Sequence, residues 1–241
     1  MKRKLDALAR EQFDIVIVGA GAFGAAAAWD ASQRGLRVAL IEQGDFGGGA
    51  SAECFKFVHG GIRYLQHANI SRLRSSCRER SALLRIAPHL VKPMPIVLPT
   101  FGSGRNGKAF LGAGMMVYDL LTTGRNAGIR DPTRRIAPAQ FLSRTGLLAL
   151  FPELDQPGLS GAAVFEDGQM YSPPRLVLAF VKSAFRRGAC VANYVQASDF
   201  LWEGSRVRGV RARDALSGDK FDIRARLVLN AAGPWAEYLL D

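Results

Sequence analysis

The sequence is poor in cysteine and histidine, with three residues of each among 241. Cys54, Cys77 and Cys190 lie far apart in the chain, and no two cysteines have C-x-x-C spacing. An odd number of dispersed cysteines argues against a disulfide framework and against a zinc site. We therefore expect no metal, and a reducing compartment such as the cytoplasm.

Long apolar runs are missing as well. No uninterrupted apolar stretch reaches the roughly 18 residues that span a bilayer. The nearest, residues 109–121, has the length of a core helix or an interfacial segment. Residues 1–12 are basic but lack the apolar core of a secretory signal, and we expect a frayed lead-in there.

Acidic residues are in the minority, because 32 lysines and arginines face 21 aspartates and glutamates and give a formal net charge of +11. A basic protein of this kind can favour phosphorylated substrates, anionic lipid or nucleic acid. We interpret most of the charge as solvated surface, including the basic face of a helix expected over residues 71–87. No aromatic-interleaved basic patch or nucleic-acid motif accompanies that helix, which argues against a nucleic-acid partner.

The most informative pattern that is present covers residues 13–42, FDIVIVGAGAFGAAAAWDASQRGLRVALIE. A short apolar strand rich in β-branched residues is expected at residues 14–18. It leads into a G-x-G-x-x-G motif and an Ala-rich helix over residues 25–33, and a second apolar strand at residues 37–41 ends on Glu42. This order matches the full dinucleotide-binding fingerprint, whereas a Gly-rich turn of another α/β protein would not need all its parts.

Each residue type in the fingerprint has a chemical reason. Gly19 permits the tight turn, Gly21 lets a pyrophosphate approach the backbone, and Gly24 lets helix and strand pack closely. The backbone amides at the helix start, at Ala22 and Phe23, are expected to face the phosphates.

Two further features follow the second strand. Glu42 can accept a hydrogen bond from a ribose hydroxyl. The Gly-rich loop Gln43–Ser51, QGDFGGGAS, leaves backbone amides bare, and Ser51 offers a hydroxyl at an expected helix start. Because ligands of open α/β sheets bind beyond the carboxyl ends of the strands, we favour cofactor contact at Gln43 and Ser51 over a flexible surface loop.

A second candidate cluster lies in residues 56–65, KFVHGGIRYL. Two adjacent glycines allow close approach of a flat ligand ring, or a special turn. Arg63 can form a forked pair with a phosphate or carboxylate, and His59 is a possible proton partner for a substrate. The local density of Lys, His, Gly-Gly, Arg and Tyr favours a site, so His59, Arg63 and Tyr64 are the candidate catalytic residues.

The whole pattern predicts an α/β fold: a Rossmann-type FAD- or NAD(P)-binding domain with a parallel central sheet and an inserted, incomplete substrate domain. We expect the nucleotide-binding domain at residues 1–87 and 158–241, with a partly helical insertion at residues 88–157. The other expected elements are strands at residues 96–98, 159–165, 189–195 and 227–230 (the last one buried), a turn at 166–168, helices at residues 137–150 and 175–187, and a meander over residues 200–224.

Together these motifs resemble the FAD-dependent glycerol-3-phosphate dehydrogenases, within the broader family of D-amino acid oxidase-like flavoproteins. The resemblance rests on the fingerprint and on GDFGGGAS, KFVHGGIRYLQH, RERSALLRIAPHLV and NAAGPW. It covers nearly the whole chain, from Phe13 to Leu240. The HGGIRYL and RIAPHLV blocks are specific to the glycerol-phosphate branch, whereas the fingerprint and NAAGPW are shared more widely.

The resemblance implies FAD rather than NAD at the fingerprint glycines and Glu42. Arg63 matches the family arginine that binds the substrate at the active site, and Tyr64 is its neighbour. At Ala50 and Ala52 this chain lacks two hydroxyls that the family carries on either side of Ser51. The further cofactor contacts that the resemblance implies fall on Ser51, Lys56, Phe57 and His59 on the flavin side, on the backbone of Val195 at the adenine, and on Ala232 and Gly233.

The resemblance also implies a reaction and partners. Family members oxidise glycerol 3-phosphate to dihydroxyacetone phosphate, pass the electrons to membrane quinone or oxygen, and attach peripherally to the cytoplasmic face of the membrane. The alternatives are a flavoenzyme acting on another hydroxy acid, an amine or an amino acid, and a non-catalytic flavin-binding fragment. The third alternative arises because the downstream half of the family enzyme is not found in these 241 residues, so the chain resembles an N-terminal fragment.

Overall fold

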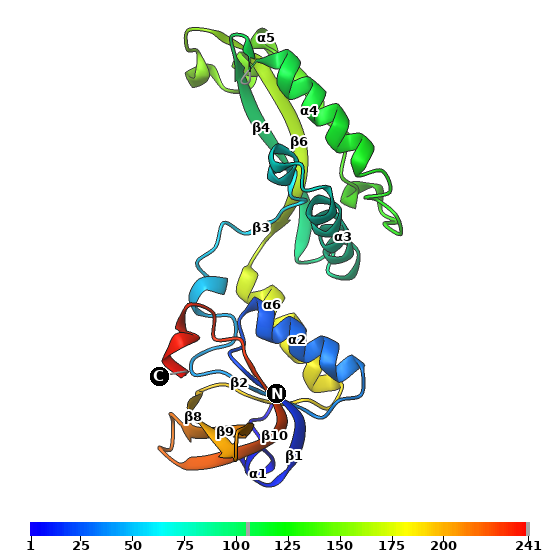
Figure 1. The fold of residues 1–241 in the computed structure, drawn as a ribbon. Coiled ribbons are helices and arrows are strands. Elements are labelled where there is room, and N and C mark those ends of the chain that lie inside the picture. Colours follow the sequence, from blue (N-terminus) through cyan, green and yellow to red (C-terminus); the bar gives the residue numbers. More distant parts are fainter. Residues whose placement is uncertain (105–106, 240–241) are drawn as a thin grey trace. The chain divides into compact units, whose positions relative to one another are not determined.

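The computed structural model describes residues 1–104 and 107–239, and the chain forms two compact units (Figure 1). The first unit contains Met1–Phe55 and Ser172–Asp241, and the second contains Lys56–Tyr171. The boundaries expected from the sequence, after residues 87 and 157, therefore fall inside the second unit.

A six-stranded sheet forms the centre of the first unit. Its strands are β1 (Gln12–Val18), β2 (Val38–Ile41), β7 (Cys190–Ala192), β8 (Val195–Glu203), β9 (Arg206–Asp214) and β10 (Lys220–Asn230). The order is β7-β2-β1-β10-β9-β8, with parallel pairing from β7 to β10 and antiparallel pairing from β10 to β8. The predicted parallel central sheet and the predicted meander are both confirmed.

Strand β10 belongs to both parts of this sheet. Residues 220–224 pair with β9, and residues 224–230 pair with β1. The strand expected to be buried at residues 227–230 is thus the second part of β10. Its burial was predicted wrongly, because Leu227 and Leu229 expose 58% and 36% of their surface.

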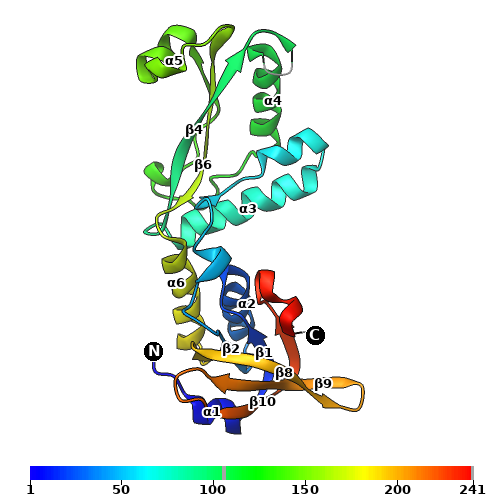
Figure 2. The same ribbon diagram turned by 90° about the vertical axis from the view of Figure 1, so that its left-hand side faces the viewer.

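Two helices pack on one face of the first unit's sheet (Figures 1 and 2). The alanines of α2 (Ala22–Gln33) let the helix come close to the strands, and α6 (Pro173–Arg186) lies beside it. Ile17 and Leu40 of the sheet share a buried core with Val181 of α6. The core places the start of α2 directly beyond the carboxyl end of β1.

On the opposite face, a short N-terminal helix, α1 (Leu5–Arg10), packs into a core that side chains of β1, β2 and the meander strands share. Leu8 is fully buried and lies in one core with Phe13 and Ile223. The frayed lead-in expected at residues 1–12 is therefore wrong, because one apolar side chain anchors this helix to the sheet.

An antiparallel sheet forms the second unit, in the order β3-β6-β4 with β5 also paired to β6. Its elements are β3 (Phe57–Val58), α3 (Ile70–Ile86), β4 (Val91–Phe101), α4 (Lys108–Leu121), β5 (Gln140–Ser143), α5 (Arg144–Leu150) and β6 (Leu159–Met170). β6 pairs with β4 along almost its whole length, and α3 packs against β4. These contacts explain why the second unit extends beyond residues 88–157 on both sides.

The turn expected at residues 166–168 is wrong, because these residues lie inside β6. Gly168 faces Pro93 of β4 in the ladder, and on its other side β3 approaches closely. A Cβ added at Gly168 would lie 2.8 Å from the carbonyl oxygen of Val58. The glycine therefore marks a close contact between strands, which the sequence pattern alone presents as a turn.

Strand β4 is longer than the segment 96–98 that the sequence predicted. Pro93, Pro95 and Pro99 are an even number of residues apart, so they occupy equivalent positions of the pleat. Within the described residues β4 pairs with β6 alone, so its outward-facing residues need no N–H donor, and an edge strand tolerates proline there.

The helix expected at residues 137–150 is correct only in its second half. Residues 140–143 form β5, and α5 follows, capped where the Ser143 hydroxyl accepts from the Gly146 amide at 3.1 Å. The helices expected near residues 71–87 and 109–121 are confirmed as α3 and α4. Across the described part of the chain, no helix combines the length and the apolar character needed to cross a membrane.

Candidate functional site

The glycine turn between β1 and α2 is closely packed. Gly19 has φ +99°, and its amide donates to the Ile41 carbonyl at 2.8 Å. A Cβ added at Gly24 would lie 1.9 Å from the carbonyl oxygen of Gly19, and one added at Gly19 would lie 2.6 Å from that of Ala231. The turn and the helix–strand packing thus need both glycines, in agreement with the reasons given by the fingerprint.

The Gly-rich loop that follows β2 lies at the start of α2. The Ser51 hydroxyl accepts a hydrogen bond from the Ala22 amide at 2.9 Å, which caps the helix from outside. A Cβ added at Gly21 would lie 3.0 Å from this hydroxyl oxygen. Phe23, the next residue of the helix, is 87% exposed. The loop therefore lies against the first amides of the helix, at the positive end of the helix dipole.

Glu42 lies half-buried at the carboxyl end of β2, as predicted. Its two carboxylate oxygens accept from the amides of Ala20 at 2.7 Å and Gly44 at 3.0 Å. The backbone carbonyl of Glu42 accepts from the Val195 amide at 2.8 Å, which brings the start of β8 to the same edge. Gln43 follows Glu42 and is exposed.

The segment after β10 completes this edge of the first unit. The Ala231 amide donates to the Val18 carbonyl at 2.8 Å, so NAAGPW lies next to the glycine turn. Gly233 has φ +61° and begins a short 3-10 helix that ends at Trp235. A Cβ added at Gly49 would lie 2.8 Å from the indole ring, so Trp235 lies directly on the Gly-rich loop. The structure thus brings together the cofactor-contact residues predicted in this unit.

The other predicted site residues belong to the second unit. Lys56 has φ +60°, and its carbonyl accepts from the Met170 amide at 2.7 Å, while Phe57 begins β3. His59 and Arg63 are exposed. They lie on either side of the buried Gly60-Gly61 pair, with half-buried Ile62 between that pair and Arg63.

Tyr64 is half-buried and lies against α3. The guanidinium of Arg72 lies 4.9 Å from the centre of its ring, a cation–π distance, and Leu73 packs in the same cluster. A Cβ added at Gly61 would lie 2.6 Å from the Tyr64 ring. These contacts hold the Tyr64 side chain against α3. The catalytic role assigned to Tyr64 stays a prediction.

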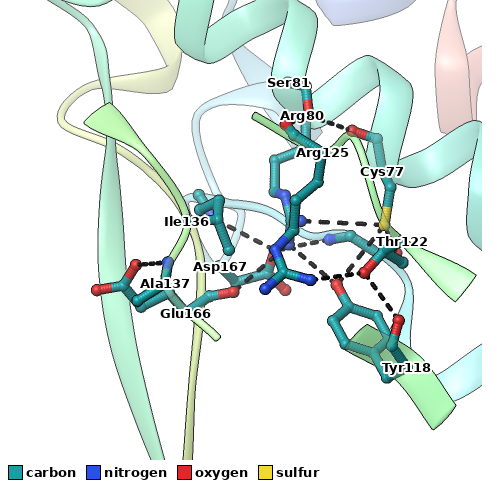
Figure 3. A network of polar contacts seen from close by, with 12 residues as sticks. Cys77, Arg80, Ser81, Tyr118, Thr122, Arg125, Ile136, Ala137, Glu166 and Asp167 are labelled. Atoms are coloured by element: carbon teal, nitrogen blue, oxygen red, sulfur yellow. Dashed lines mark hydrogen bonds and ion pairs between the residues drawn. The ribbon is translucent and has the colours of Figure 1, made fainter. Parts of the chain in front are cut away.

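A buried polar network beneath this segment was missed by the sequence analysis (Figure 3). Arg80 was expected on the solvated face of α3, yet it is fully buried and pairs with Asp167 at 2.8 Å. Tyr118 of α4 and Cys77 of α3 complete the network. The only available signal was the alignment of Arg80 with Leu73, Cys77 and Leu84 at helical spacing, on the apolar side.

Burial opposes the charge of Arg80, and the contacts within the network preserve it. Burial alone lowers the pKa of Arg80, but its contacts with Tyr118 and Asp167 outweigh burial and raise the pKa. Burial also raises the pKa of Tyr118, so its hydroxyl stays protonated at neutral pH. The opposing charge for the guanidinium therefore comes from Asp167.

A β-α-β crossover with closely packed glycines and a carboxylate at the end of its second strand defines a dinucleotide-binding domain of the Rossmann type. The family model described as "DAO: FAD dependent oxidoreductase" matches residues 14–241, and the chain belongs to this family. The resemblance seen in the sequence is thereby confirmed.

Relatives and solved structures agree with this assignment. The chain is 36% identical over 231 residues to an aerobic glycerol-3-phosphate dehydrogenase of Staphylococcus haemolyticus. The matched region covers 95% of this chain and 40% of the relative. It is 37% identical over 239 residues to the human mitochondrial glycerol-3-phosphate dehydrogenase, covering 94% of this chain and 31% of the relative. The glycerol-3-phosphate dehydrogenase from Bacillus halodurans, solved with FAD, matches with a TM-score of 0.69 at 28% identity, over 95% of this chain and 36% of that one. The chain thus spans 31–40% of the length of these proteins.

Proposed function

We propose that this chain binds FAD and forms part of an enzyme that oxidises glycerol 3-phosphate to dihydroxyacetone phosphate. The observation that carries the proposal is the closely packed glycine turn with Glu42 at its edge, in a chain 36–38% identical to named glycerol-3-phosphate dehydrogenases. Because the chain spans 31–40% of the length of those relatives, the described residues account for part of the machinery of such an enzyme.

The first unit fits the pyrophosphate and ribose of a dinucleotide. The bare backbone of the glycine turn admits a phosphate, and the amides that begin α2 supply donors and a positive dipole end. Because the Ser51 hydroxyl already accepts from Ala22, its own proton is directed away to donate to a cofactor oxygen. Each carboxylate oxygen of Glu42 keeps a further lone pair for a ribose hydroxyl. Val195, Ala232 and Gly233 are proposed as backbone contacts along the same edge.

The second unit carries the residues proposed for the substrate. FAD supplies a two-electron acceptor for alcohol oxidation. Arg63 is exposed and offers a guanidinium that can pair with the substrate phosphate through two hydrogen bonds. His59 is proposed to hold or move the proton of the substrate hydroxyl, or to pack on the cofactor with Lys56 and Phe57.

Glycerol 3-phosphate is favoured over other substrates by the relatives that share more than a third of the sequence. Proline dehydrogenase and glycine oxidase structures also match, but at 18% and 24% identity, which shows the fold alone. Amines and amino acids therefore remain the second candidates, and a substrate screen separates the two classes.

The test begins with the absorbance spectrum of the purified chain after addition of FAD and desalting. A retained flavin band that glycerol 3-phosphate bleaches without oxygen is the expected result. Glycine and proline serve as control substrates and should leave the band unchanged. A colourless protein would contradict cofactor binding by these residues, and a band bleached only by an amino acid would contradict the substrate.

The electron acceptor is proposed to be quinone or oxygen, with peripheral contact to the membrane. The membrane contact is supported by the outer face of α4, where Phe110, Met116 and Leu120 are 58%, 71% and 71% exposed, and by the net charge of +11. Sedimentation with anionic vesicles at low salt should carry the chain down, and Phe110→Asp with Leu120→Asp should release it. Trp202→Asp, which alters an equally exposed aromatic residue of β8, is the control.

A further inference from the structure

The two peptide groups that meet at Gly60 are each held by a buried group. Its N–H donates to the Oδ1 atom of Asp167 at 2.6 Å, and its carbonyl accepts from the Sγ atom of Cys77 at 3.1 Å. Gly60 is buried, whereas His59 before it and Arg63 after it are exposed. The fixed backbone of Gly60 therefore lies between two exposed side chains that are candidates for substrate contact.

The two partners of Gly60, Asp167 and Cys77, are linked to each other through the side chains of Arg80 and Tyr118, and together these groups form a ring (Figure 3). The Nη1 atom of Arg80 donates to Asp167 at 2.8 Å and to the hydroxyl of Tyr118 at 3.2 Å. That hydroxyl lies 3.6 Å from Cys77 Sγ. When Tyr118 donates to Cys77 and Cys77 donates to Gly60, the hydrogen bonds run from Arg80 through Tyr118 and Cys77 to the Gly60 carbonyl, and Asp167 closes the ring by accepting from both Arg80 and the Gly60 amide. Successive hydrogen bonds that run in one direction, as they do from Arg80 to the Gly60 carbonyl, strengthen one another.

The ring lies directly against the glycine. A Cβ added at Gly60 would lie 2.3 Å from Arg80 Nη1 and 2.6 Å from the Tyr118 hydroxyl oxygen. Asp167 also accepts from the Gly168 amide at 3.2 Å, which ties the ring to β6. The segment is therefore connected to α3, α4 and β6 at once.

A buried ion pair is a poor device for stability alone, because apolar side chains of similar size usually serve as well. Here the pair is also imperfectly satisfied, since Arg80 Nε finds no hydrogen-bond partner among residues 1–104 and 107–239. The ring instead fixes the orientation of the two peptide groups that meet at Gly60, through hydrogen-bond partners that apolar side chains cannot supply.

We propose that Asp167, acting through the ring of Arg80, Tyr118 and Cys77, is a positioning residue that fixes the Gly60 backbone and so orients Arg63 and His59 toward the phosphorylated substrate. The hydrogen bonds of the ring form without substrate, whereas the role of orienting Arg63 and His59 rests on the proposed function. The two can therefore be tested separately.

The first test is amide hydrogen exchange of the 241-residue chain without substrate. Asp167→Asn keeps the size and an acceptor oxygen of the side chain but removes the charge opposite Arg80. Exchange in peptides covering residues 58–64 should rise about tenfold more than exchange in β4 of the same unit, while α6 of the first unit stays protected. Asp214→Asn is the matched control, because Asp214 is as deeply buried and pairs with Arg3 in the other unit.

A second variant covers the case in which Asp167→Asn does not fold. Tyr118→Phe keeps the aromatic side chain in its cluster with Leu73 and leaves the Arg80–Asp167 pair intact. It removes the hydroxyl that connects Arg80 to Cys77, so the ring of hydrogen bonds is broken. The same local rise in exchange is expected. Exchange that rises evenly over the whole second unit, or not at all, would overturn the positioning role.

The second test asks whether the ring acts through Arg63. Affinity for glycerol 3-phosphate is measured on the FAD-loaded chain for Tyr118→Phe, Arg63→Ala and the double variant. Tyr118→Phe should weaken binding by about tenfold in the wild-type background and leave it unchanged when Arg63 is already absent. Additive losses would show that the ring does not act through Arg63.

The outcomes separate the two proposals. If the wild-type chain does not bind glycerol 3-phosphate but residues 58–64 open in Tyr118→Phe, the substrate assignment fails and the ring keeps its role on the backbone. If glycerol 3-phosphate binds and the exchange of residues 58–64 is unchanged in both ring variants, the substrate assignment stands and the positioning role fails.

Discussion

At the residue scale, each unit has an arginine–aspartate pair whose carboxylate is buried. Arg80 pairs with Asp167 in the second unit, and Arg3 pairs with Asp214 in the first. Asp167 and Asp214 expose only 4% and 2% of their surface, so losing a partner leaves a charge that water cannot reach. Each pair therefore gives a prediction for its own unit.

Arg80→Met should destabilise the second unit strongly. Removing one partner of a buried pair costs about 3–5 kcal/mol, because the other charge stays buried and unpaired. Arg78→Met, which changes an exposed arginine of the same helix, should stay within about 0.5 kcal/mol. Urea denaturation of the two variants measures the difference, and equal midpoints would contradict the burial of the Arg80 charge.

Asp214 makes the first unit sensitive to acid. Burial alone raises the pKa of Asp214, but hydrogen bonds from Arg3, Ser217 and Leu216 outweigh burial and hold the pKa below the ordinary 3.8. A carboxyl with a lowered folded-state pKa stabilises the protein above its unfolded pKa and loses this effect as the pH falls further. Asp214→Asn should therefore be less stable than wild type at pH 6, with a difference that shrinks below about pH 4. A constant difference from pH 6 to pH 3 would show that the charge of Asp214 is not responsible.

Gly24→Ala tests the glycine turn. Its Cβ would lie 1.9 Å from the Gly19 carbonyl oxygen, so helix α2 must move away from β1. We expect loss of FAD retention and a clear drop in melting temperature. Gly114→Ala is the matched control, because a Cβ there meets nothing within 4 Å and alanine favours a helix by about 0.5–1 kcal/mol. Flavin absorbance after desalting measures the first effect.

At the scale of elements, β10 presents an open edge. Its pairing with β9 ends at Arg224, so beyond that residue the side that faced β9 has no strand partner in the described part of the chain. Leu227 and Leu229 are exposed on this same stretch. An apolar strand with a free edge is a template for another strand, either in a longer chain or in a second molecule.

Charging this edge should reduce self-association. Leu227→Lys with Leu229→Thr is expected to shift the chain toward monomer in sedimentation velocity, because edge charges discourage strand pairing. Leu216→Lys changes a leucine that is 65% exposed in the turn before β10 and serves as control. An unchanged distribution for the double variant would show that β10 is not where molecules meet.

The extents of elements were predictable where one principle dominated. The fingerprint predicted β1, α2 and β2, because strand, glycines and helix are all short-range features. Gly168 and the prolines of β4 misled the prediction, since local turn signals there serve strand packing and an edge position. Which of those roles a glycine or proline has depends on partners far away in the sequence.

At the scale of the whole molecule, the candidate site was predictable as a set of motifs but not as a structure. Gly19, Gly24 and Glu42 follow from sequence because their function is local. The ring around Arg80 could not be predicted, because Gly60, Tyr118 and Asp167 are separated by up to 107 residues. A charged residue on an amphipathic helix usually faces solvent, and only the three-dimensional structure shows that Arg80 is buried.

The contact between Trp235 and Gly49 also provides an optical signal. The chain has three tryptophans, and this indole lies on the Gly-rich loop beside the glycine turn. Excitation energy passes efficiently from an indole to a flavin held nearby, so occupation of the turn should darken the emission of Trp235. The fluorescence of Trp235 would then follow binding and release of the cofactor at this loop without any added label.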